Sequence, residues 1–524
     1  MAGYDVIAVG AGANGLIAAA YMAKAGKKVL VLERGAWFGG GVATHEAVSP
    51  GFRHDIHSAT HIVIQGNPLI RNDELGLISK FGLKYIYPEG IFSTIFDDQT
   101  SIVSYSDLDK TCQSIAAVSP RDADAYRRFT TKGLETLPLI ASSLYVPPAP
   151  QGAFWALLDQ SAQGRALMRI MQCSMLDLVN EWFEHDKIKI HLLKFAAETL
   201  VGPDEKGTGM ILYSMPGFVH SYPPGSPEGG SGALVDALVR CLQSYGAELR
   251  AEVDVTKVLV QNGWAVGVRL ADGEVVRANT AVIGQIHPHL LGGMVEGLDE
   301  SLVANARRTH PASFALTAAH FALNAPPRYH AGDEPGRVAL ANFAPATLES
   351  YRRIFDDFKY GDLSRDQIIA AHVNSNFDPS RAPAGKATLT LYGFAPFELR
   401  NGGSAAWDER KAEAADILYR AYGHYVSNLD STNVIDWKFE TPLDVQRYSP
   451  TFQSADVGGV GKYFYQIGGH RPTPELSQYA VPGAKGLYLA GTFMHPPGGV
   501  TGGGRATAVK MCGDLGIKFE SLVG

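Results

Sequence analysis

Apolar and polar positions alternate in blocks along the first 35 residues, and the blocks predict a strand, a helix and a second strand. The apolar run at 6–9 suits a parallel strand that is buried on both faces. An alanine-rich segment from about Asn14 to Ala25 predicts a helix that lies close to that strand, and Gly26 ends it. The apolar run at 29–32 predicts the second strand. This succession is typical of a doubly wound α/β domain.

The turn between the first strand and the helix carries Gly10, Gly12 and Gly15 at the spacing G-x-G-x-x-G. The first glycine permits a tight turn, the second leaves room for a pyrophosphate beside the backbone, and the third allows the helix to pack against its strand. The amides of the helix N-terminus would then point at the phosphates. Glu33 ends the second strand, where a carboxylate accepts hydrogen bonds from the ribose of a dinucleotide. Together these features indicate a dinucleotide site rather than a chance glycine turn.

The residues after Glu33 favour FAD over NAD. A nicotinamide dehydrogenase would continue with strands and helices, whereas this chain continues with Gly39-Gly40-Gly41 and a polar loop. Consecutive glycines indicate close approach of the backbone to a ligand. The segment resembles the FAD-containing phytoene dehydrogenase and amine oxidase superfamily, and within it the phytoene desaturase-like branch. The resemblance implies that Arg34, Gly40 and Gly41 contact the cofactor.

A second block of the same domain is predicted at 227–282. A glycine-rich turn leads into a helix that ends at Gly246. Three short strands follow, and Asn262-Gly263 and Asp272-Gly273 between them are strong hairpin signals. The family resemblance implies that this block reaches the adenine through the backbone near Val253.

The C-terminal segment is similar to the last FAD motif of the same family. A buried strand at 486–491 leads to the glycine-rich turn 498–504, and a helix is expected from about Arg505 to Gly513. The N-terminus of that helix would stabilise the negative charge that gathers on the flavin upon reduction. The resemblance places four residues at the flavin: Gly491, Gly499, Val500 and Thr501. Thr492 stands where related flavoproteins often have an acidic residue.

The remaining segments predict a second domain. Residues 66–225 look helical, with breaks at prolines such as Pro138 and a long helical stretch from about 154 to 200. Strands are expected within 288–470, together with an amphipathic helix at 407–429. The apolar segment at 137–163 could rest on a membrane surface or cover an apolar tunnel, but its scarcity of basic residues favours a helix pair that faces the core.

The fold class expected is therefore α/β, with a Rossmann-like FAD-binding domain assembled from discontinuous segments and an α+β substrate domain that contains a mixed sheet. Residues 1–65, 226–287 and 471–524 form the first domain. Residues 66–225 and 288–470 form the second, with 66–225 mainly helical and able to act as a lid.

The loop at 45–61 is rich in polar side chains. A metal site, an acid/base group and a hydrogen-bonded loop over the flavin are three interpretations of this pattern, and the last is favoured; no metal is predicted. The candidates for acid/base catalysis are His54, Asp55 and His57. His495 is a further candidate, because it lies between the last strand and the glycine turn, where the chain must pass the flavin. The alternative for His495 is a loop histidine that hydrogen-bonds the backbone.

Composition narrows the class of protein. With 46 basic and 53 acidic residues among 524, the net charge of −7 does not favour a nucleic acid partner. Four widely spaced cysteines indicate neither disulfides nor a zinc site, which fits a reducing, cytoplasmic location. Neither a cleaved signal peptide nor a membrane-spanning run is expected. Peripheral contact with a membrane stays open.

The predicted function is an FAD-dependent oxidoreductase that removes a hydride and a proton from an apolar, isoprenoid or alicyclic substrate. FAD is expected to bind noncovalently, because neither flavin-proximal glycine segment contains cysteine. No second G-x-G-x-x-G follows, so the electron acceptor is oxygen, a quinone or a partner protein. Amine oxidation, double-bond isomerisation and double-bond saturation are alternatives, as is a binding protein similar to the Rab GDP-dissociation inhibitors.

Overall fold

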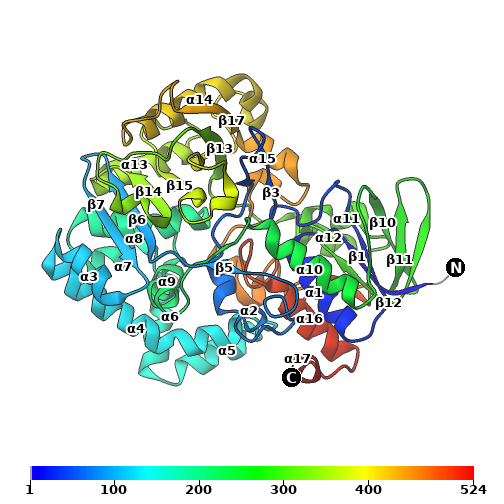
Figure 1. Ribbon diagram of the computed structural model, residues 1–524. Coiled ribbons are helices and arrows are strands. Elements are labelled where there is room, and N and C mark those ends of the chain that lie inside the picture. Colours follow the sequence, from blue (N-terminus) through cyan, green and yellow to red (C-terminus); the bar gives the residue numbers. More distant parts are fainter. Residues whose placement is uncertain (1–2, 524) are drawn as a thin grey trace.

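Two seven-stranded sheets organise the chain in the computed structural model, which describes residues 3–523. Figure 1 shows the sheets side by side, with both chain ends near the first sheet. The first sheet has the order β10-β11-β12-β1-β2-β9, with β18 beside β12. Its strands are β1 (Tyr4–Val9), β2 (Val29–Leu32), β9 (Glu248–Arg250), β10 (Val255–Gln261), β11 (Trp264–Leu270), β12 (Val275–Gly284) and β18 (Leu487–Leu489).

The first sheet combines three segments that are far apart in the sequence. β1 pairs in parallel with β2 on one side and with β12 on the other, while β18 extends β12 in parallel. β10, β11 and the start of β12 form an antiparallel meander at the positions where the Asn-Gly and Asp-Gly turns predict hairpins. The expected Rossmann-like arrangement is confirmed, whereas the exact domain boundaries stay a prediction.

Three helices cover this sheet: α1 (Ala13–Lys24), α10 (Gly232–Ser244) and α16 (Gly503–Asp514). α1 contacts both of the others (Figure 1). The approach of α1 to α16 depends on Gly504, since a Cβ there would lie 2.0 Å from the carbonyl oxygen of Asn14. Gly504 of α16 therefore permits the close packing of these two helices.

The second sheet is mixed, with the order β17-β13-β16-β15-β14-β6-β7. β14 and β6 pair in parallel and the other neighbours are antiparallel. Its strands are β6 (Gly90–Phe96), β7 (Ser101–Tyr105), β13 (Ala315–Leu323), β14 (Val338–Ala344), β15 (Ile369–His372), β16 (Ala387–Ala395) and β17 (Val434–Glu440). The mixed sheet is confirmed, but the prediction that 66–225 is helical and irregular missed β6 and β7.

The helical part of 66–225 differs from the predicted long helix. It contains α3 (Leu108–Ala116), α4 (Pro120–Leu144), α5 (Gln151–Asp159), α6 (Ala162–Gln172), α7 (Met175–Trp182), α8 (Asp186–Thr199) and α9 (Gly209–Ser221). The stretch 154–200 is divided because Ser161, Ser174 and His185 each accept a hydrogen bond from a backbone amide two or three residues later and so start a new helix. The predicted break at Pro138 is also wrong, since α4 continues through it.

Helices cover both faces of the second sheet. Strand residues such as Phe92 and Leu340 pack with the helices of 66–225, and alternate residues such as Ile95 and Phe321 pack with α14 on the other face. The remaining helices are α2 (Pro68–Arg71), α11 (Leu291–Met294), α12 (Glu300–Arg307), α13 (Leu348–Lys359), α14 (Trp407–Gly423), α15 (Pro442–Tyr448) and α17 (Glu520–Val523). α14 ends six residues before the predicted end at Leu429.

Short two-stranded ladders join the loops between the sheets. They are β3 (Thr44–His45) with β4 (His54–Asp55), and β5 (Tyr85–Ile86) with β8 (Ser226–Pro227). None of the helices within 3–523 combines the length and the apolar character that crossing a bilayer requires.

Candidate active site

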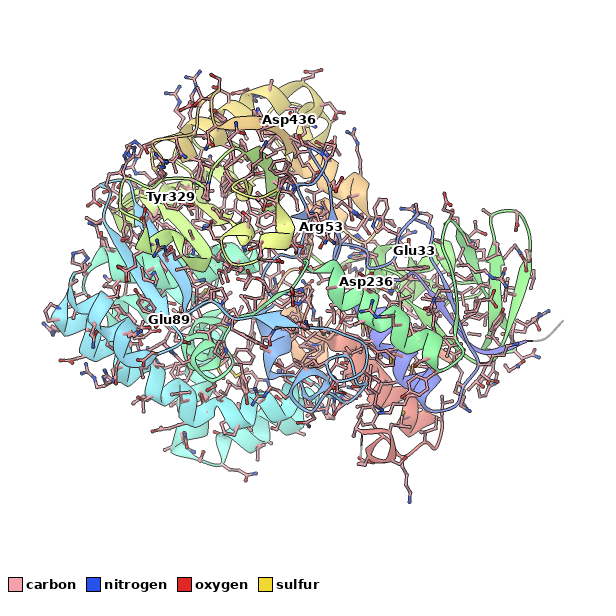
Figure 2. All side chains as sticks on the ribbon, viewed as in Figure 1. Glu33, Arg53, Glu89, Asp236, Tyr329 and Asp436 are labelled. Atoms are coloured by element: carbon pink, nitrogen blue, oxygen red, sulfur yellow. The ribbon has the colours of Figure 1, made fainter. Side chains whose placement is uncertain are left out.

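A cavity of about 950 Å³ extends from the glycine turn after β1 to one face of the second sheet. One end is lined by residues of the dinucleotide motif, such as Gly10 and Glu33, and the other by strand residues such as Leu340 and Phe394. Figure 2 labels Glu33 beside the first sheet and Tyr329, in the loop after β13, beside the second sheet. The cavity thus connects the two parts of the fold.

The dinucleotide end is built mainly from backbone. Gly10 has φ +88°, a conformation that favours glycine, and Gly12 precedes α1 without any side-chain cap. The first residues of α1, Ala13 and Asn14, line the cavity. The free amides of a helix N-terminus carry partial positive charge, so this end of the cavity suits an anionic phosphate.

Glu33 lies at the edge of the same region. Its Oε2 accepts a hydrogen bond from the amide of Ala11 and its Oε1 accepts one from the amide of Gly35, each at 2.7 Å. The carboxylate is thereby held in one orientation while it lines the cavity. Its remaining lone pairs are available to hydroxyl groups of a ligand.

Gly15 does not line the cavity. A Cβ at Gly15 would lie 2.1 Å from Nε2 of Gln285, the residue that follows β12. The same nitrogen donates to the carbonyl oxygens of Gly10, at 2.6 Å, and Gly12, at 3.3 Å. The amide side chain of Gln285 therefore braces the turn. The sequence offered no signal for it, because β12 becomes the neighbour of β1 only in the folded sheet.

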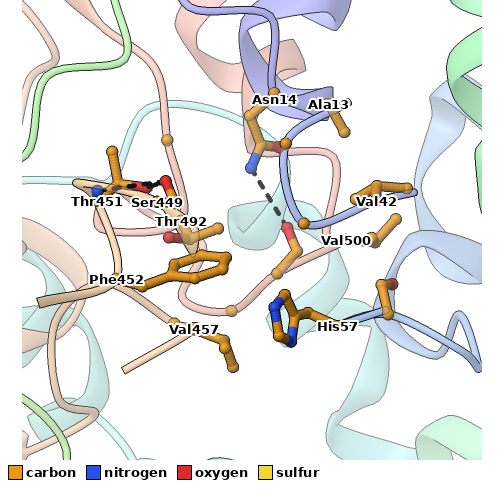
Figure 3. Close-up of a pocket in the computed structure, with 18 of the residues that line it drawn as sticks. Ala13, Asn14, Val42, His57, Ser449, Thr451, Phe452, Val457, Thr492 and Val500 are labelled. Carbon is orange, nitrogen blue, oxygen red and sulfur yellow. Dashed lines mark hydrogen bonds between the residues drawn. The ribbon is translucent and has the colours of Figure 1, made fainter. Parts of the chain in front are cut away.

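The other predicted cofactor residues all line the cavity: Arg34, Gly40, Gly41, Val253, Gly491, Gly499, Val500 and Thr501. Asn14 ties the two glycine motifs together, since its Nδ2 donates to the carbonyl of Gly499 at 3.3 Å and its Oδ1 accepts from the amide of Gly504 at 3.3 Å. Figure 3 shows the first of these bonds close to Val500 and Val42. The role of each residue toward a cofactor stays a prediction.

The glycines along this part of the cavity leave room for a dinucleotide. A Cβ on Gly499 would meet no atom within 4 Å, and one on Gly40 would lie 3.5 Å from the Cα of Gly12. Glycine at these positions therefore keeps space open beside the ligand path. At the second glycine motif, the backbone enters α16 through Gly502 without a side-chain cap, and Thr501 lines the cavity. Two helix N-termini thus lie along one cavity.

Among the predicted acid/base residues, His57 lines the cavity. Its ring lies edge-on to Tyr448 at 4.7 Å and to Phe452 at 5.4 Å, and within 3–523 neither ring nitrogen has a hydrogen-bond partner (Figure 3). Burial lowers the pKa of His57 to about 4. The imidazole is therefore neutral at pH 7, and both of its nitrogens are buried beneath the cavity surface with one donor and one acceptor unused among the described residues.

His54 and Asp55 lie behind the cavity wall. Nε2 of His54 pairs with the carbonyl of Phe321 at 3.1 Å. Asp55 forms an ion pair with Arg381 at 2.8 Å, in which both side chains are buried, and it also accepts from the amide of Ser231. These contacts favour a structural role, in which the pair anchors the loop that carries His57. The predicted catalytic roles of His54 and Asp55 stay untested.

His495 also lies outside the cavity lining, although Pro496 and Pro497 belong to it. Its Nε2 pairs with the carbonyl of Ser143 at 3.0 Å, and burial lowers its pKa to about 4. The contact joins the C-terminal glycine segment to the end of α4. It favours the interpretation of His495 as a loop histidine that binds backbone.

The far end of the cavity is an apolar chamber between the second sheet and α4, α8 and α9. Its apolar walls are Ile140, Leu144, Phe195, Ile211, Met215, Phe218, Leu316, Leu340 and Phe394. Ile140 and Leu144 come from the apolar segment at 137–163, while Leu139 beside them is 40% exposed. That segment thus forms part of the chamber wall and also presents apolar side chains outward.

His372 and Tyr392 also line the chamber, and the sequence did not point to them. Their rings lie edge-on at 5.6 Å. Nδ1 of His372 pairs with the carbonyl of Ala339 at 3.1 Å, and burial lowers the pKa of His372 to about 4. The hydroxyl of Tyr392 donates to the carbonyl of Ile56. Both residues sit on strands whose inward face is decided by the sheet, so no local motif marks them.

No cluster of side chains within 3–523 has the composition and spacing to hold a metal ion. The histidines of the 45–61 loop separate accordingly: His54 and His61 bind protein groups, and His57 faces the cavity.

Comparison with known proteins adds whole-length similarity. A family model described as an NAD(P)-binding Rossmann-like domain matches residues 9–71. One subunit of the limonene dehydrogenase of Castellaniella defragrans is 26% identical, over 98% of this chain and 95% of that protein. A lycopene-forming phytoene desaturase of Pseudescherichia vulneris is 23% identical, over 97% of this chain and 99% of its own length.

The fold has a solved counterpart in putrescine oxidase bound to putrescine, with a TM-score of 0.62 and 14% identity over 98% of this chain and 99% of that one. At this identity the likeness concerns the fold alone. It confirms the α/β class and the pairing of a Rossmann-like domain with a second, mixed-sheet region.

Proposed function

We propose that this chain is an FAD-dependent oxidoreductase of the phytoene desaturase-like type, which dehydrogenates an alicyclic or isoprenoid substrate while holding FAD noncovalently. One observation carries the proposal: a single cavity joins both glycine motifs to an apolar chamber. A cofactor in the first part and a substrate in the second would meet inside the protein.

The chamber favours a largely apolar substrate. Its walls are aliphatic and aromatic side chains from α4, α8, α9 and the second sheet. Transfer of apolar surface from water into such a site contributes about 25 cal/mol per Å². Limonene and phytoene, after which two whole-length relatives are named, are hydrocarbons of this character.

FAD, when bound, supplies the hydride acceptor, and the protein supplies binding, orientation and exclusion of water. Glu33 and the glycine turn would hold the adenosine half of FAD. The N-terminus of α1 would face the phosphates, and the N-terminus of α16 would face the flavin. The apolar chamber keeps water away from the reacting carbons. His57 would receive the proton at whichever ring nitrogen carries its lone pair.

A weak base is sufficient to accept the proton that the substrate releases. Removal of a hydride leaves an electron-poor carbon, and the C–H bonds beside it then release a proton readily. His57 is neutral at pH 7 because burial lowers its pKa to about 4, so its acceptor nitrogen is free to take the proton. The two hydrogens leave adjacent carbons and a carbon–carbon double bond remains.

Noncovalent attachment is supported by the lining of the cavity. Within 3–523 the lining includes no cysteine, and Nε2 of His495 is engaged by the carbonyl of Ser143. Flavin released into the supernatant on acid precipitation is the expected result. Colour that stays with the protein pellet would contradict it.

The electron acceptor proposed is oxygen, a quinone or a partner protein. The relative from Castellaniella is named as one subunit of a dehydrogenase, which supports a partner protein among these.

Leu139 and Leu157, which are 40% and 56% exposed, support peripheral contact of α4 and α5 with a membrane. Double-bond isomerisation or saturation would use the same cavity and is the second candidate for the direction of the chemistry.

The experiment that tests the function is anaerobic mixing of the purified holoprotein with limonene, phytoene and putrescine. Reduction of the flavin by a hydrocarbon, but not by putrescine, supports the proposal. Reduction by putrescine alone would favour amine oxidation, and protein that binds no flavin would favour the non-enzymatic alternative. Isomerised limonene without net flavin reduction would favour the isomerase.

A further inference from the structure

An ammonium group faces the largely apolar chamber. Lys462 lines the cavity, and its Nζ donates to the carbonyl of Thr199 at 3.1 Å. Within 3–523 no carboxylate oxygen lies within 4.0 Å of this nitrogen. An ammonium has three donors and only one is used here, so two remain for a ligand.

The carboxylate that lines the chamber beside it is already engaged. Glu198, one residue before Thr199 at the end of α8, lines the cavity and forms an ion pair with the buried Lys194 at 2.5 Å. Nζ of Lys194 also lies 3.2 Å from the centroid of the Phe92 ring. Glu198 therefore neutralises Lys194 and contributes to Lys462 only from a distance.

None of the other charges around Lys462 forms an ion pair with it among residues 3–523. Asp456 accepts from the amides of Ala312, at 2.9 Å, and Gly458, at 2.8 Å. Arg471 is completely buried and donates to backbone carbonyls alone, among them those of Thr492 and Val460. Three cations (Lys194, Lys462 and Arg471) and two carboxylates (Glu198 and Asp456) thus give one net positive charge, and among these described residues the only ion pair joins Lys194 to Glu198.

Burial lowers the pKa of Lys462 to about 8, while Asp456 and Glu198 act to raise it and Arg471 to lower it further. Most of the lysine is still charged at pH 7. A cation of this kind in an apolar site is unfavourable unless an anion or a strong acceptor binds to it.

We propose that Lys462 determines substrate specificity by binding a carboxylate on the substrate, so that this protein prefers an alicyclic or isoprenoid acid to a plain hydrocarbon. The carboxylate would take the two free donors of Lys462, and the apolar body would fill the chamber. The pair would be a charge-assisted hydrogen bond shielded from water. This inference rests on the proposed function, because it identifies the substrate class of the same site.

The test compares three molecules that share one ring: limonene, perillyl alcohol and perillic acid. Dissociation constants are measured by titration calorimetry with the holoprotein, so that binding is read separately from flavin reduction. The wild-type protein is expected to bind perillic acid about tenfold more tightly than limonene, as a charge-assisted hydrogen bond provides.

Lys462→Met is expected to lose that preference and to bind limonene as well as before, because the methionine side chain keeps the volume and removes the charge. Lys462→Arg should retain the preference for the acid. Lys257→Met, a substitution of a half-buried lysine on β10 that also donates to a backbone carbonyl, serves as the matched control and should change neither constant. Flavin content and circular dichroism establish that each variant is folded.

The proposal is overturned if wild-type protein binds perillic acid no more tightly than limonene or perillyl alcohol, or if Lys462→Met keeps the preference. These outcomes are distinct from failure of the proposed function, which would appear as absence of bound flavin or of any flavin reduction. A protein that is reduced by limonene but shows no preference for the acid would keep the function and lose this inference.

Discussion

The two ends of the cavity are made in different ways. The dinucleotide end consists of backbone and glycine within two short motifs, which Asn14 joins across 485 positions of the sequence. The chamber consists of single side chains from strands and helices that are scattered along the chain. A cofactor shared by many enzymes can be held by backbone groups, whereas a particular substrate requires particular side chains. Substitutions at either end of the cavity, and at the His57 loop between the ends, test this difference.

The largest effect is expected where the loop of His57 is anchored between the two ends. Arg381→Met would leave the buried carboxylate of Asp55 without its cation, and the expected loss of unfolding free energy is about 3–5 kcal/mol. Chemical denaturation measures it. The double variant Arg381→Met with Asp55→Asn removes both charges and should recover much of the loss. Equal losses in the single and double variants would show that the ion pair does not anchor the loop.

The next largest effect is expected at the dinucleotide end of the cavity. Gly504→Ala places a Cβ 2.0 Å from the carbonyl oxygen of Asn14, a backbone atom that cannot move aside without shifting α1. We expect a loss of about 1–3 kcal/mol in unfolding free energy together with lower FAD content. Gly499→Ala is the control, because its Cβ meets nothing and should leave stability unchanged while it weakens FAD binding. Equal melting temperatures for the two variants would be inconsistent with this account.

His57 lies where the two ends meet, and His57→Gln keeps hydrogen bonding but removes the proton acceptor. The rate of flavin reduction by substrate should fall about a hundredfold, with FAD content unchanged. Stopped-flow measurement under anaerobic conditions gives the rate. A variant as fast as wild type would assign His57 to packing against Tyr448 and Phe452 and return attention to His54 and Asp55.

The same histidine predicts a pH dependence. Because burial lowers the pKa of His57 to about 4, the wild-type rate should be independent of His57 from about pH 6 to 8 and fall as the pH approaches 4. The stability that comes from keeping His57 neutral is fully present above the unfolded pKa of about 6.5 and is lost as the pH falls toward 4. A rate that falls with an apparent pKa near 6.5 would contradict the buried position of the ring.

The most limited effect, confined to cofactor affinity, is expected from Glu33→Ala. The carboxylate holds the amides of Ala11 and Gly35 and is predicted to bind the ribose, so FAD binding should weaken by roughly 1.5–3 kcal/mol without a change in the rate of the loaded enzyme. Equilibrium dialysis of FAD gives the affinity. Full FAD occupancy with slow turnover would remove Glu33 from the ribose site.

Several features of the fold could be predicted because local chemistry decides them. The G-x-G-x-x-G turn, the strands on either side of it and the Asn-Gly hairpin all follow from neighbours in the sequence, and the structure contains them. The division of the segment 154–200 was also marked locally, since Ser174 and Asp177 form a capping box. Helical periodicity concealed that signal, which is why one helix was predicted where several occur.

Other features had no local signal. Gln285 braces the glycine turn only because β12 lies beside β1, and Lys462 faces the chamber only because its loop folds toward the end of α8. Likewise, His57, His54 and Asp55 are nearly consecutive, yet the first faces the cavity and the other two face protein.

The α/β class and the glycine positions that line the cavity follow from the sequence alone, since backbone binding of phosphate requires glycines at set spacings, and FAD is the cofactor that the sequence predicts. Which ionisable side chains enter the chamber, and which are engaged by protein, is settled only when the chain folds. That choice depends on strand order and on which buried charges find partners, and both are properties of contacts between residues far apart in the chain.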